Sequence, residues 1–202
     1  MRNFGWRRER RRKVRRSRPT ELHERFAHAR LTLAKVQHLE IRPATEADAQ
    51  RCQRYVAELF DEQLPVLFRR DQPPTVEEQR AFIAQVGSSA RSVAFLALES
   101  DRVIGILDFR AFQKPQQAHG GTFGMSVAKA VRGTGVGKEL LKALFAWGRS
   151  NAVRRIELEV FSNNERAIQF YKRAGFVLEG RKREAVEVDG RLVDLLQMAK
   201  FL

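Results

Sequence analysis

The sequence predicts an α/β fold, because strand-like and helix-like segments both recur along the chain. Residues 154–161 alternate between apolar and polar side chains, which is typical of a strand with one buried face. Residues 136–149 repeat apolar side chains at helical spacing and so predict an amphipathic helix. Asp189-Gly190 separates two strand-like segments, and this dipeptide is the strongest short signal of a β-hairpin.

The composition fits one domain with an appended basic tail. The chain has 202 residues and a net charge of +14, and single domains commonly have about 100–150 residues. Residues 1–20 hold ten Arg or Lys residues and one acid, Glu9. We expect this segment to be a solvated, disordered tail, with an arm for nucleic acid or an acidic surface as the alternative. Residues 21–37 could form a helical linker, and the domain would then occupy 38–202.

The composition also argues against several classes of protein. No apolar run approaches the roughly 20 residues of a membrane helix, and no apolar segment follows the basic N-terminus as in a secretory signal. Cys52 is the only cysteine, so we expect it in the core, without a disulfide or a thiolate metal cluster. The four His residues lack ligand spacing. These features favour a cytoplasmic protein without membrane contact or a metal site.

The first half of the domain combines one strand with two capped helices. We expect a strand at 38–42, followed by a helix whose N-cap is Thr45, with Asp48 three residues later. Residues 75–78, Thr-Val-Glu-Glu, form a capping-box pattern for a second helix that ends near Gly87. The proline-bearing segment between these helices is expected to be a loop.

Strands and helices then alternate towards the C-terminus. Ser162 begins another capping-box pattern, for a helix that Gly175 stops. The remaining strands are expected at 93–99, 103–112, 121–129, 176–188 and 192–201.

A glycine-rich turn between the strand at 121–129 and the next helix is the most informative stretch. It holds Arg132, Gly133, Gly135 and Gly137. Glycine lets the main chain lie directly against a ligand, and a helix that begins there leaves N–H groups unpaired at its positive end. Such a turn binds phosphate oxygens, to which Arg132 could add a positive fork. The turn therefore predicts a site for a cofactor that carries a pyrophosphate, unless it is only a tight turn.

Two familiar phosphate-binding loops do not fit this turn. The nucleoside-triphosphate loop needs Gly-x-x-x-x-Gly-Lys-Ser/Thr, but Glu139 follows Lys138, and Arg132 stands five positions before Gly137. The dinucleotide fingerprint needs Gly-x-Gly-x-x-Gly, whose third glycine would fall on Lys138 or Leu140. What remains is Arg-x-x-Gly-x-Gly between a strand and a helix.

The order strand, Arg-x-x-Gly-x-Gly, helix, strand, Asn-x-x-Ala, helix, Gly-Phe, hairpin is more specific than the turn alone. It resembles the GNAT superfamily of acetyl-CoA-dependent N-acetyltransferases. The residues that carry the match are Val127, Arg132-Gly133-Thr134-Gly135-Val136-Gly137, Asn164-Glu165-Arg166-Ala167-Ile168, Phe170-Tyr171, Gly175-Phe176 and Ile41-Arg42-Pro43-Ala44-Thr45. The resemblance covers about residues 38–202, and residues 179–199 look like the branch that acetylates free amino acids and ribosomal-protein N-termini. It implies a twisted, mixed and mostly antiparallel sheet of six to seven strands flanked by about four helices.

The resemblance implies acetyl-CoA as a co-substrate. In the family, main-chain amides of the matching turn hold the pyrophosphate, and pantetheine lies between two strands that splay apart. The cofactor contacts implied here are Met125, Val127, Arg132, Gly133, Thr134, Gly135, Val136, Gly137, Lys138, Asn164 and Ala167. For Asn164, helix capping is the alternative role.

The resemblance also implies catalytic roles. Tyr171 matches the family's tyrosine near the thioester sulfur, where the leaving thiolate needs a proton donor; a core aromatic is the alternative. Many members place Glu or Asp where this chain has Thr122, so a direct carboxylate base is in doubt. His119, nearby in the sequence, or Glu159, on the opposing strand, could act through water; the alternatives are a surface-loop histidine without a role and a solvated strand face. A main-chain N–H near 125–127 would stabilise the oxyanion.

We therefore expect acetyl transfer from acetyl-CoA to a primary amine by direct attack. An α-amine needs a weaker base than a lysine, because its pKa is about 7.7–8.0 rather than about 10.4. A small α-amino compound or a protein N-terminus is the favoured acceptor. The alternatives are a CoA-binding sensor or inactive relative, because of Thr122, and a nucleic-acid-associated protein that uses residues 1–20. A homodimer is left open.

Overall fold

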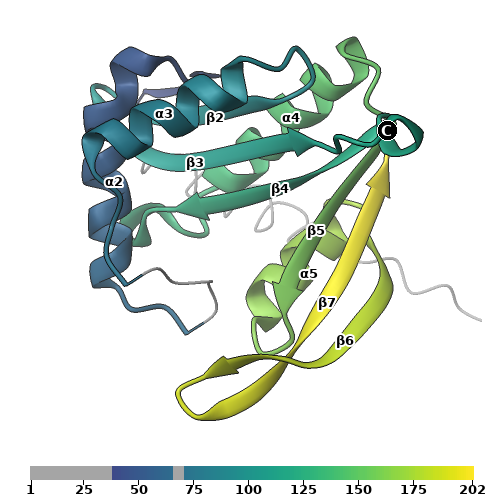
Figure 1. The fold of residues 1–202 in the computed structure, drawn as a ribbon. Helices are drawn as coiled ribbons and strands as arrows, with labels where there is room; N and C mark the ends of the chain where they lie inside the picture. Colours follow the sequence, from purple (N-terminus) through teal and green to yellow (C-terminus); the bar gives the residue numbers. More distant parts are fainter. Residues whose placement is uncertain (1–37, 66–70) are drawn as a thin grey trace, which may run out of the picture.

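Seven strands form one sheet, in the spatial order β1-β2-β3-β4-β5-β7-β6. The computed structural model describes residues 38–65 and 71–202 (Figure 1), so the predictions for residues 1–20 and 21–37 lie outside the described residues. The strands are β1 (Leu39–Pro43), β2 (Val93–Glu99), β3 (Arg102–Ala111), β4 (Gly120–Val127), β5 (Arg155–Phe161), β6 (Val177–Val188) and β7 (Arg191–Phe201). Neighbouring strands are antiparallel except β4 and β5, which confirms the mixed, mostly antiparallel sheet.

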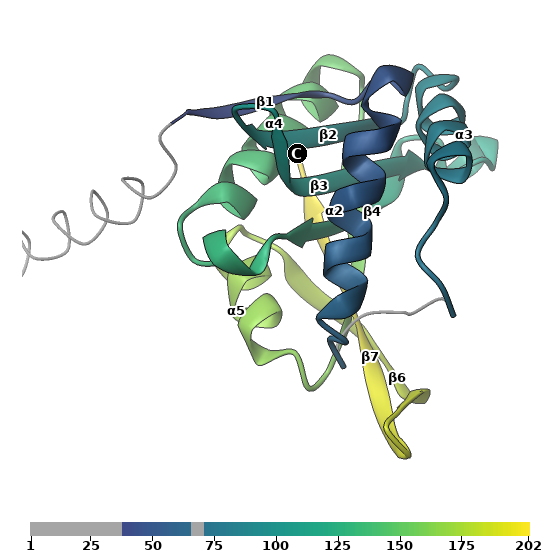
Figure 2. The same ribbon diagram turned by 90° about the vertical axis from the view of Figure 1, so that its left-hand side faces the viewer.

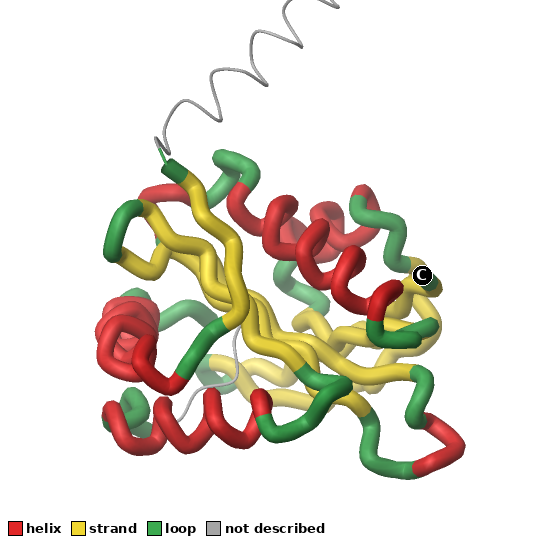
Figure 3. Tube along the Cα trace, turned by 90° about the horizontal axis from the view of Figure 1, so that it is seen from above, coloured by secondary structure: helices red, strands yellow, loops and turns green. Residues whose placement is uncertain are grey.

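Helices cover both faces of this sheet (Figure 3). The described residues form the four helices α2 (Ala49–Asp61), α3 (Val76–Gly87), α4 (Val136–Ser150) and α5 (Glu165–Arg173), with short 3-10 turns at Glu46–Asp48, Pro115–Gln117 and Lys129–Val131. The first two helices pack on one face, and α4 and α5 pack on the other. Within the described ranges, no helix has the length and apolarity needed to cross a membrane.

The apolar core lies on both sides of β2. Phe95 and Ala97 pack in the cluster that includes α4, whereas Leu96 and Leu98 pack in the cluster under α2 and α3. The unbroken apolar run of β2 is typical of a strand buried on both faces. Cys52 of α2 is buried beside Leu96 and Leu98, as predicted.

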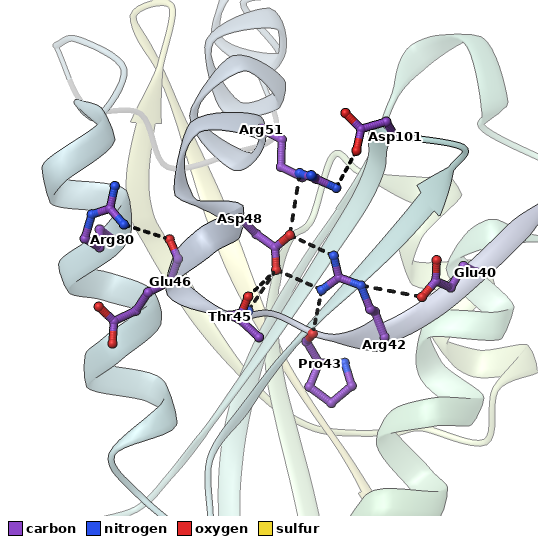
Figure 4. A network of polar contacts seen from close by, with 9 residues as sticks. All are labelled: Glu40, Arg42, Pro43, Thr45, Glu46, Asp48, Arg51, Arg80 and Asp101. Carbon is purple, nitrogen blue, oxygen red and sulfur yellow. Dashed lines mark hydrogen bonds and ion pairs between the residues drawn. The ribbon is translucent and has the colours of Figure 1, made fainter.

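A polar network fixes the start of α2 against the end of β1 (Figure 4). Asp48 accepts hydrogen bonds from Arg42 Nη1 and Nη2, at 2.8 and 2.7 Å, and from the Thr45 N–H at 2.9 Å. These contacts hold the pKa of the Asp48 carboxyl well below its usual range, with the Arg42 hydrogen bond as the largest cause. Arg51 lies 3.6 Å from Asp48 and 2.8 Å from Asp101, which links the network to the β2–β3 turn. Thr45 is the N-cap as predicted, although the first turn is 3-10.

The parallel strands β4 and β5 pair only at their beginnings. The paired residues are Gly120–Thr122 on β4 and Arg155–Glu157 on β5, after which the two strands diverge (Figure 1). Because β4 remains paired with β3 up to Val127, the divergence leaves one edge of β4 open inside the sheet. The glycine turn follows directly at the open end.

Two local predictions were wrong, and each has a structural reason. The N-cap of α5 is Asn164 rather than Ser162, because the Ser162 N–H still donates to Asp194 of β7 at 2.9 Å and so continues the sheet. Strand β4 ends at Val127 rather than at Lys129, because a 3-10 turn begins there. The other predicted strands and the helix at 136–149 agree with the structure within one residue at each end.

The hairpin of β6 and β7 extends away from the rest of the domain (Figures 1 and 2). Its turn is Asp189-Gly190, as predicted, with φ values of 48° and 73°. Both values are positive, as a two-residue hairpin of this kind requires. The hairpin therefore continues the sheet beyond β5 without covering the open edge of β4.

Candidate active site

A cavity of about 370 Å³ lies between the end of β4, the glycine turn and α5. Ten residues that the sequence assigned to the site line it: Met125, Val127, Arg132, Gly133, Gly135, Gly137, Lys138, Asn164, Ala167 and Tyr171. Leu59, Leu64, Ser126, Arg166 and Phe170 complete the lining. The glycine turn, Asn164 and Tyr171, which are distant in the sequence, thus belong to one cavity.

The glycine turn presents main-chain donors to this cavity. Gly133 and Gly135 have φ values of 86° and 105°, which few residues other than glycine adopt. Gly135 is the N-cap of α4 and offers no side chain to the first turn. Among the described residues, the N–H groups of Gly133, Gly135, Val136 and Gly137 have no acceptor. This helix N-terminus therefore has the properties of an anion site.

Two residues assigned to the turn contribute no side chain to the cavity. Thr134 is buried, and its Oγ1 donates to the Val131 carbonyl at 2.7 Å. Val136 is 1% exposed and packs in the core under α4. Any contact that these two residues make with a ligand must therefore come from their main chain.

Arg132 is oriented by protein groups rather than left open to solvent. Its Nε donates to the Val127 carbonyl at 2.8 Å, and its Nη2 donates to Glu62 Oε1 at 2.9 Å. Its Nη1 lies 2.7 Å from Glu62 Oε2. Glu62 follows α2 and has no motif around it, so the sequence does not predict this contact. The Arg132 charge is thus already paired beside the site at which a phosphate is expected.

Asn164 caps α5 and lines the cavity at the same time. Its Oδ1 accepts a hydrogen bond from the Ala167 N–H at 3.1 Å, which confirms the capping role. This bond uses the side-chain oxygen and leaves the amide NH₂ group, so a cofactor contact through that group stays a prediction.

Tyr171 lies against the cavity within an aromatic cluster. Its ring makes edge contacts with Phe123 and Phe176, with centroids 5.8 and 5.7 Å apart. Burial raises the pKa of Tyr171 to about 12. The hydroxyl therefore keeps its proton at neutral pH, as a proton donor must.

The open edge of β4 supplies further main-chain groups. The Ala128 N–H donates to Ile104 of β3 at 2.9 Å. Because main-chain groups alternate sides along a strand, the N–H groups of Met125 and Val127 point the other way, into the gap beside β5. Either of them could be the single main-chain N–H that is expected near 125–127 for the oxyanion.

His119 and Glu159 are not brought into the cavity. His119 is exposed and precedes β4, at the end opposite to the glycine turn, where its carbonyl accepts from the Arg154 N–H at 2.7 Å. Glu159 is exposed on β5, and its Oε1 accepts from Lys182 Nζ at 2.5 Å. Their roles as bases therefore receive no support from the geometry.

A second cavity of about 370 Å³ lies on the α2–α3 side of β4. It shares Leu59, Met125 and Ser126 with the first cavity. Its lining includes Asp108 of β3, whose pKa is raised to about 6 by burial, the largest cause. Asp108 is not among the site residues predicted from the sequence, where the available signal is an acid inside the apolar strand at 103–112.

Comparisons with known proteins identify the family. The family described as Acetyltransferase (GNAT) domain matches residues 41–196, so the chain belongs to the GNAT acetyltransferase family. L-amino acid N-acetyltransferase AaaT of Escherichia coli (strain K12) is 34% identical over 102 residues, which are 48% of this chain and 61% of that protein. Ribosomal-protein-alanine N-acetyltransferase from Brucella melitensis has a TM-score of 0.72 at 23% identity, covering 81% of this chain and 99% of that chain.

A further solved structure, yncA from Salmonella typhimurium, is described as an acetyltransferase with its cofactor acetyl-CoA. It has a TM-score of 0.74 at 18% identity, covering 82% of this chain and 95% of that chain. This structure supports the expected fold. The match to the GNAT family confirms the expected family and, with it, the co-substrate, so the chain carries an acetyl-CoA-dependent acetyltransferase domain. The match to AaaT spans about three fifths of that protein's length.

Proposed function

We propose that this chain transfers the acetyl group of acetyl-CoA to the primary amine of a small α-amino compound or a protein N-terminus. The observation that carries the proposal is the meeting of two cavities at Met125 and Ser126. The first joins the glycine turn to Tyr171, and the second opens on the other side of β4. A thioester in the first cavity and an amine in the second would meet at the end of β4.

The turn end of the first cavity is suited to the pyrophosphate of acetyl-CoA. The unpaired N–H groups of Gly133, Gly135 and Gly137 and the positive end of the α4 dipole would act together on one anion. Lys138 and Arg166 line the same cavity and add positive charge. Bound there, acetyl-CoA supplies the activated acetyl group.

The other end of this cavity is suited to acyl transfer. The N–H group of Met125 or of Val127 would donate to the carbonyl oxygen as negative charge develops on it. The loss of one such donor typically costs about 3–4 kcal/mol of transition-state stabilisation. The Tyr171 hydroxyl would donate a proton to the departing sulfur. These groups move the acetyl group without an acyl-enzyme.

The acceptor must lose a proton before it attacks. At pH 7 this costs about 1 kcal/mol for an α-amine with a pKa of about 7.7–8.0, but about 4–5 kcal/mol for a lysine-like amine with a pKa of about 10.4. An α-amine therefore needs less help from the enzyme. The name of the relative AaaT, an L-amino acid N-acetyltransferase, agrees with this choice.

A panel of amines tests the proposal. Thiol release from acetyl-CoA should accelerate at pH 7 with α-amines, such as amino acids, amino-acid amides and short peptides, more than with ε-amines blocked at the α position. Mass spectrometry of the product identifies the acetylated nitrogen. Acetyl-CoA binding without turnover on any amine would contradict the proposal and favour a sensor, which Thr122 also permits.

We propose that the basic residues 1–20 are an appendage that acetyl transfer does not need. A chain without residues 1–20 should therefore bind acetyl-CoA with unchanged affinity and keep its turnover. Loss of acetyl-CoA binding and of turnover, together with nucleic-acid binding by the full chain, would instead favour a nucleic-acid-associated protein that binds through residues 1–20.

A further inference from the structure

Asp108 is a carboxylate placed within the sheet on the side of the second cavity. Its neighbours along β3, Leu107 and Phe109, are 0% exposed and face the opposite side, into the α4 core. Asp108 pairs with Gly124 on β4, so both residues share the face that α2 and α3 cover. The same cavity includes Val56, Phe82 and Ile106 in its lining. A charged group thus stands in mostly apolar surroundings.

Gly124 leaves this carboxylate accessible. A Cβ atom at position 124 would lie 3.1 Å from Asp108 Oδ2, closer than ordinary van der Waals contact. The absent side chain therefore leaves room for the Asp108 carboxylate over Gly124, and both residues line the same cavity as Met125 and Ser126. Successive residues of a strand are about 3.3 Å apart, so Asp108 stands about two residues from the point at which the cavities meet.

The neighbouring charges leave Asp108 only partly neutralised. Its side chain is 20% exposed, and its Oδ1 lies 3.0 Å from Arg110 Nε without a hydrogen bond of good geometry. The Arg110 side chain is 57% exposed, so water screens its charge. The other charged residue of the described cavity lining is Glu78 of α3, whose Oε2 accepts from the Thr75 N–H at 2.8 Å. The described charges that line this cavity are therefore negative.

We propose that the second cavity binds the acceptor as an ammonium ion beside Asp108, and that the Asp108 carboxylate takes the proton that makes the amine nucleophilic. This inference rests on the proposed function and names its base. The neutral nitrogen then forms a bond to the thioester carbon, and the carbon–sulfur bond breaks. Tyr171 protonates the sulfur and regains a proton from the new amide nitrogen. Asp108 releases its proton to water, so one proton is produced per acetyl group.

The proton affinities suit an α-amine. With a pKa of about 6 for Asp108, transfer from an α-ammonium with a pKa of about 7.7–8.0 is uphill by roughly 2 units. An aspartate with the ordinary pKa of about 3.9 would face a gap of roughly 4 units. The carboxylate is still largely ionised at pH 7 and can attract the ammonium before it accepts the proton.

The kinetic test compares Asp108→Asn with Asp101→Asn. Asp101 carries the same side chain at the turn before β3, where it is exposed. With the best amine of the panel, Asp108→Asn should lower kcat/KM at pH 7 by about 100- to 10,000-fold. The deficit should shrink as the pH rises from 7 to 9, because the amine then loses its proton unaided. Acetyl-CoA affinity should stay unchanged in both variants, and Asp101→Asn should match the wild type. Wild-type kcat/KM with a wild-type pH profile in Asp108→Asn would overturn the inference.

An equilibrium measurement separates this inference from the proposed function. Alaninamide, an α-amine without a carboxylate, should shift the ¹³C NMR signal of the Asp108 carboxyl group in the wild-type protein and should bind at least about tenfold more weakly to Asp108→Asn. Gly124→Ala should weaken the same binding, because its methyl group approaches Oδ2. No turnover with any amine would contradict the proposed function alone. Equal alaninamide affinity in wild type and Asp108→Asn would overturn the role of Asp108 whether or not turnover is found.

Discussion

Glu62 and Arg132 lie seventy positions apart and form a two-pronged ion pair. The two nitrogen–oxygen distances are 2.7 and 2.9 Å, and the side chains are 16% and 21% exposed. The pair joins the residue after α2, on the acceptor side, to the glycine turn on the acetyl-CoA side. It also places a negative charge beside the expected phosphate site, which must weaken the pull of Arg132 on an anion.

Glu62→Gln should therefore tighten acetyl-CoA binding. Removal of one negative charge within about 10 Å of a diphosphate should lower Kd about threefold to tenfold at low salt, and the effect should fade as salt is added. Isothermal titration calorimetry at two salt concentrations measures this. Asp61→Asn, one residue earlier and exposed, is the matched control. Weaker binding in Glu62→Gln would mean that the position Glu62 gives to Arg132 matters more than its charge.

Gly135→Glu should abolish acetyl-CoA binding. Position 135 has a φ of 105°, which strains any other residue, and the new carboxylate would repel the diphosphate. The expected loss of affinity is at least about 100-fold. Gly87→Glu, at the end of α3 where an added Cβ meets open space, should bind normally. Unchanged affinity in Gly135→Glu would remove the turn from the cofactor site.

Tyr171→Phe should slow turnover while acetyl-CoA affinity stays constant. The variant keeps the ring and its contacts with Phe123 and Phe176 but loses the proton donor. We expect kcat to fall by about 100-fold or more. Steady-state kinetics and calorimetry on the same preparation separate the two quantities, and wild-type turnover would exclude Tyr171 from the chemistry.

Asp48→Asn should destabilise the fold in a pH-dependent way. Because Arg42 holds the pKa of Asp48 below its unfolded value, the ionised carboxylate stabilises the native state above about pH 4, and this contribution is lost as the pH falls towards the folded pKa. The variant should lose about 2–4 kcal/mol of unfolding free energy at pH 7, and less at pH 3.

Urea denaturation at both pH values measures the difference. Glu58→Gln is the control, because it breaks an ion pair in which Glu58 is 56% and Arg102 is 66% exposed. It should change the unfolding free energy by less than about 1 kcal/mol at either pH. An equal deficit of Asp48→Asn at pH 7 and pH 3 would contradict the assignment.

Local patterns predicted most of the fold. The glycine turn, the box at Thr75 and the Asp189-Gly190 hairpin each depend on residues within five positions of one another. An apolar run predicts the strand at 93–99, and alternation of apolar and polar side chains predicts the strand at 154–161. Such signals are read without knowledge of the tertiary structure. Local patterns fail at Ser162, which was predicted as the N-cap of α5. There the hydrogen bond from the Ser162 N–H to the distant Asp194 carbonyl keeps the residue in the sheet, so α5 begins later.

The parts of the site that sequence reasoning missed depend on long-range neighbours. Glu62 belongs to the site only because it pairs with Arg132. Asp108 belongs to it only because the strand register places it opposite Gly124. Nearness in the sequence suggests His119 as a base, and a place on the opposing strand suggests Glu159. The structure places His119 at the end of β4 opposite to the glycine turn and Glu159 on a solvated strand face.

The divergence of β4 from β5 has a consequence for dynamics. Amide hydrogens at Met125 and Val127 face a gap inside the sheet and should exchange rapidly with deuterium in the free protein, unlike those of β2. An extended pantetheine arm lying in the gap would hydrogen-bond to the open edge of β4 in the way that a neighbouring strand does. Slower exchange at these two positions on addition of acetyl-CoA would show that the ligand completes the architecture as well as supplying the acetyl group.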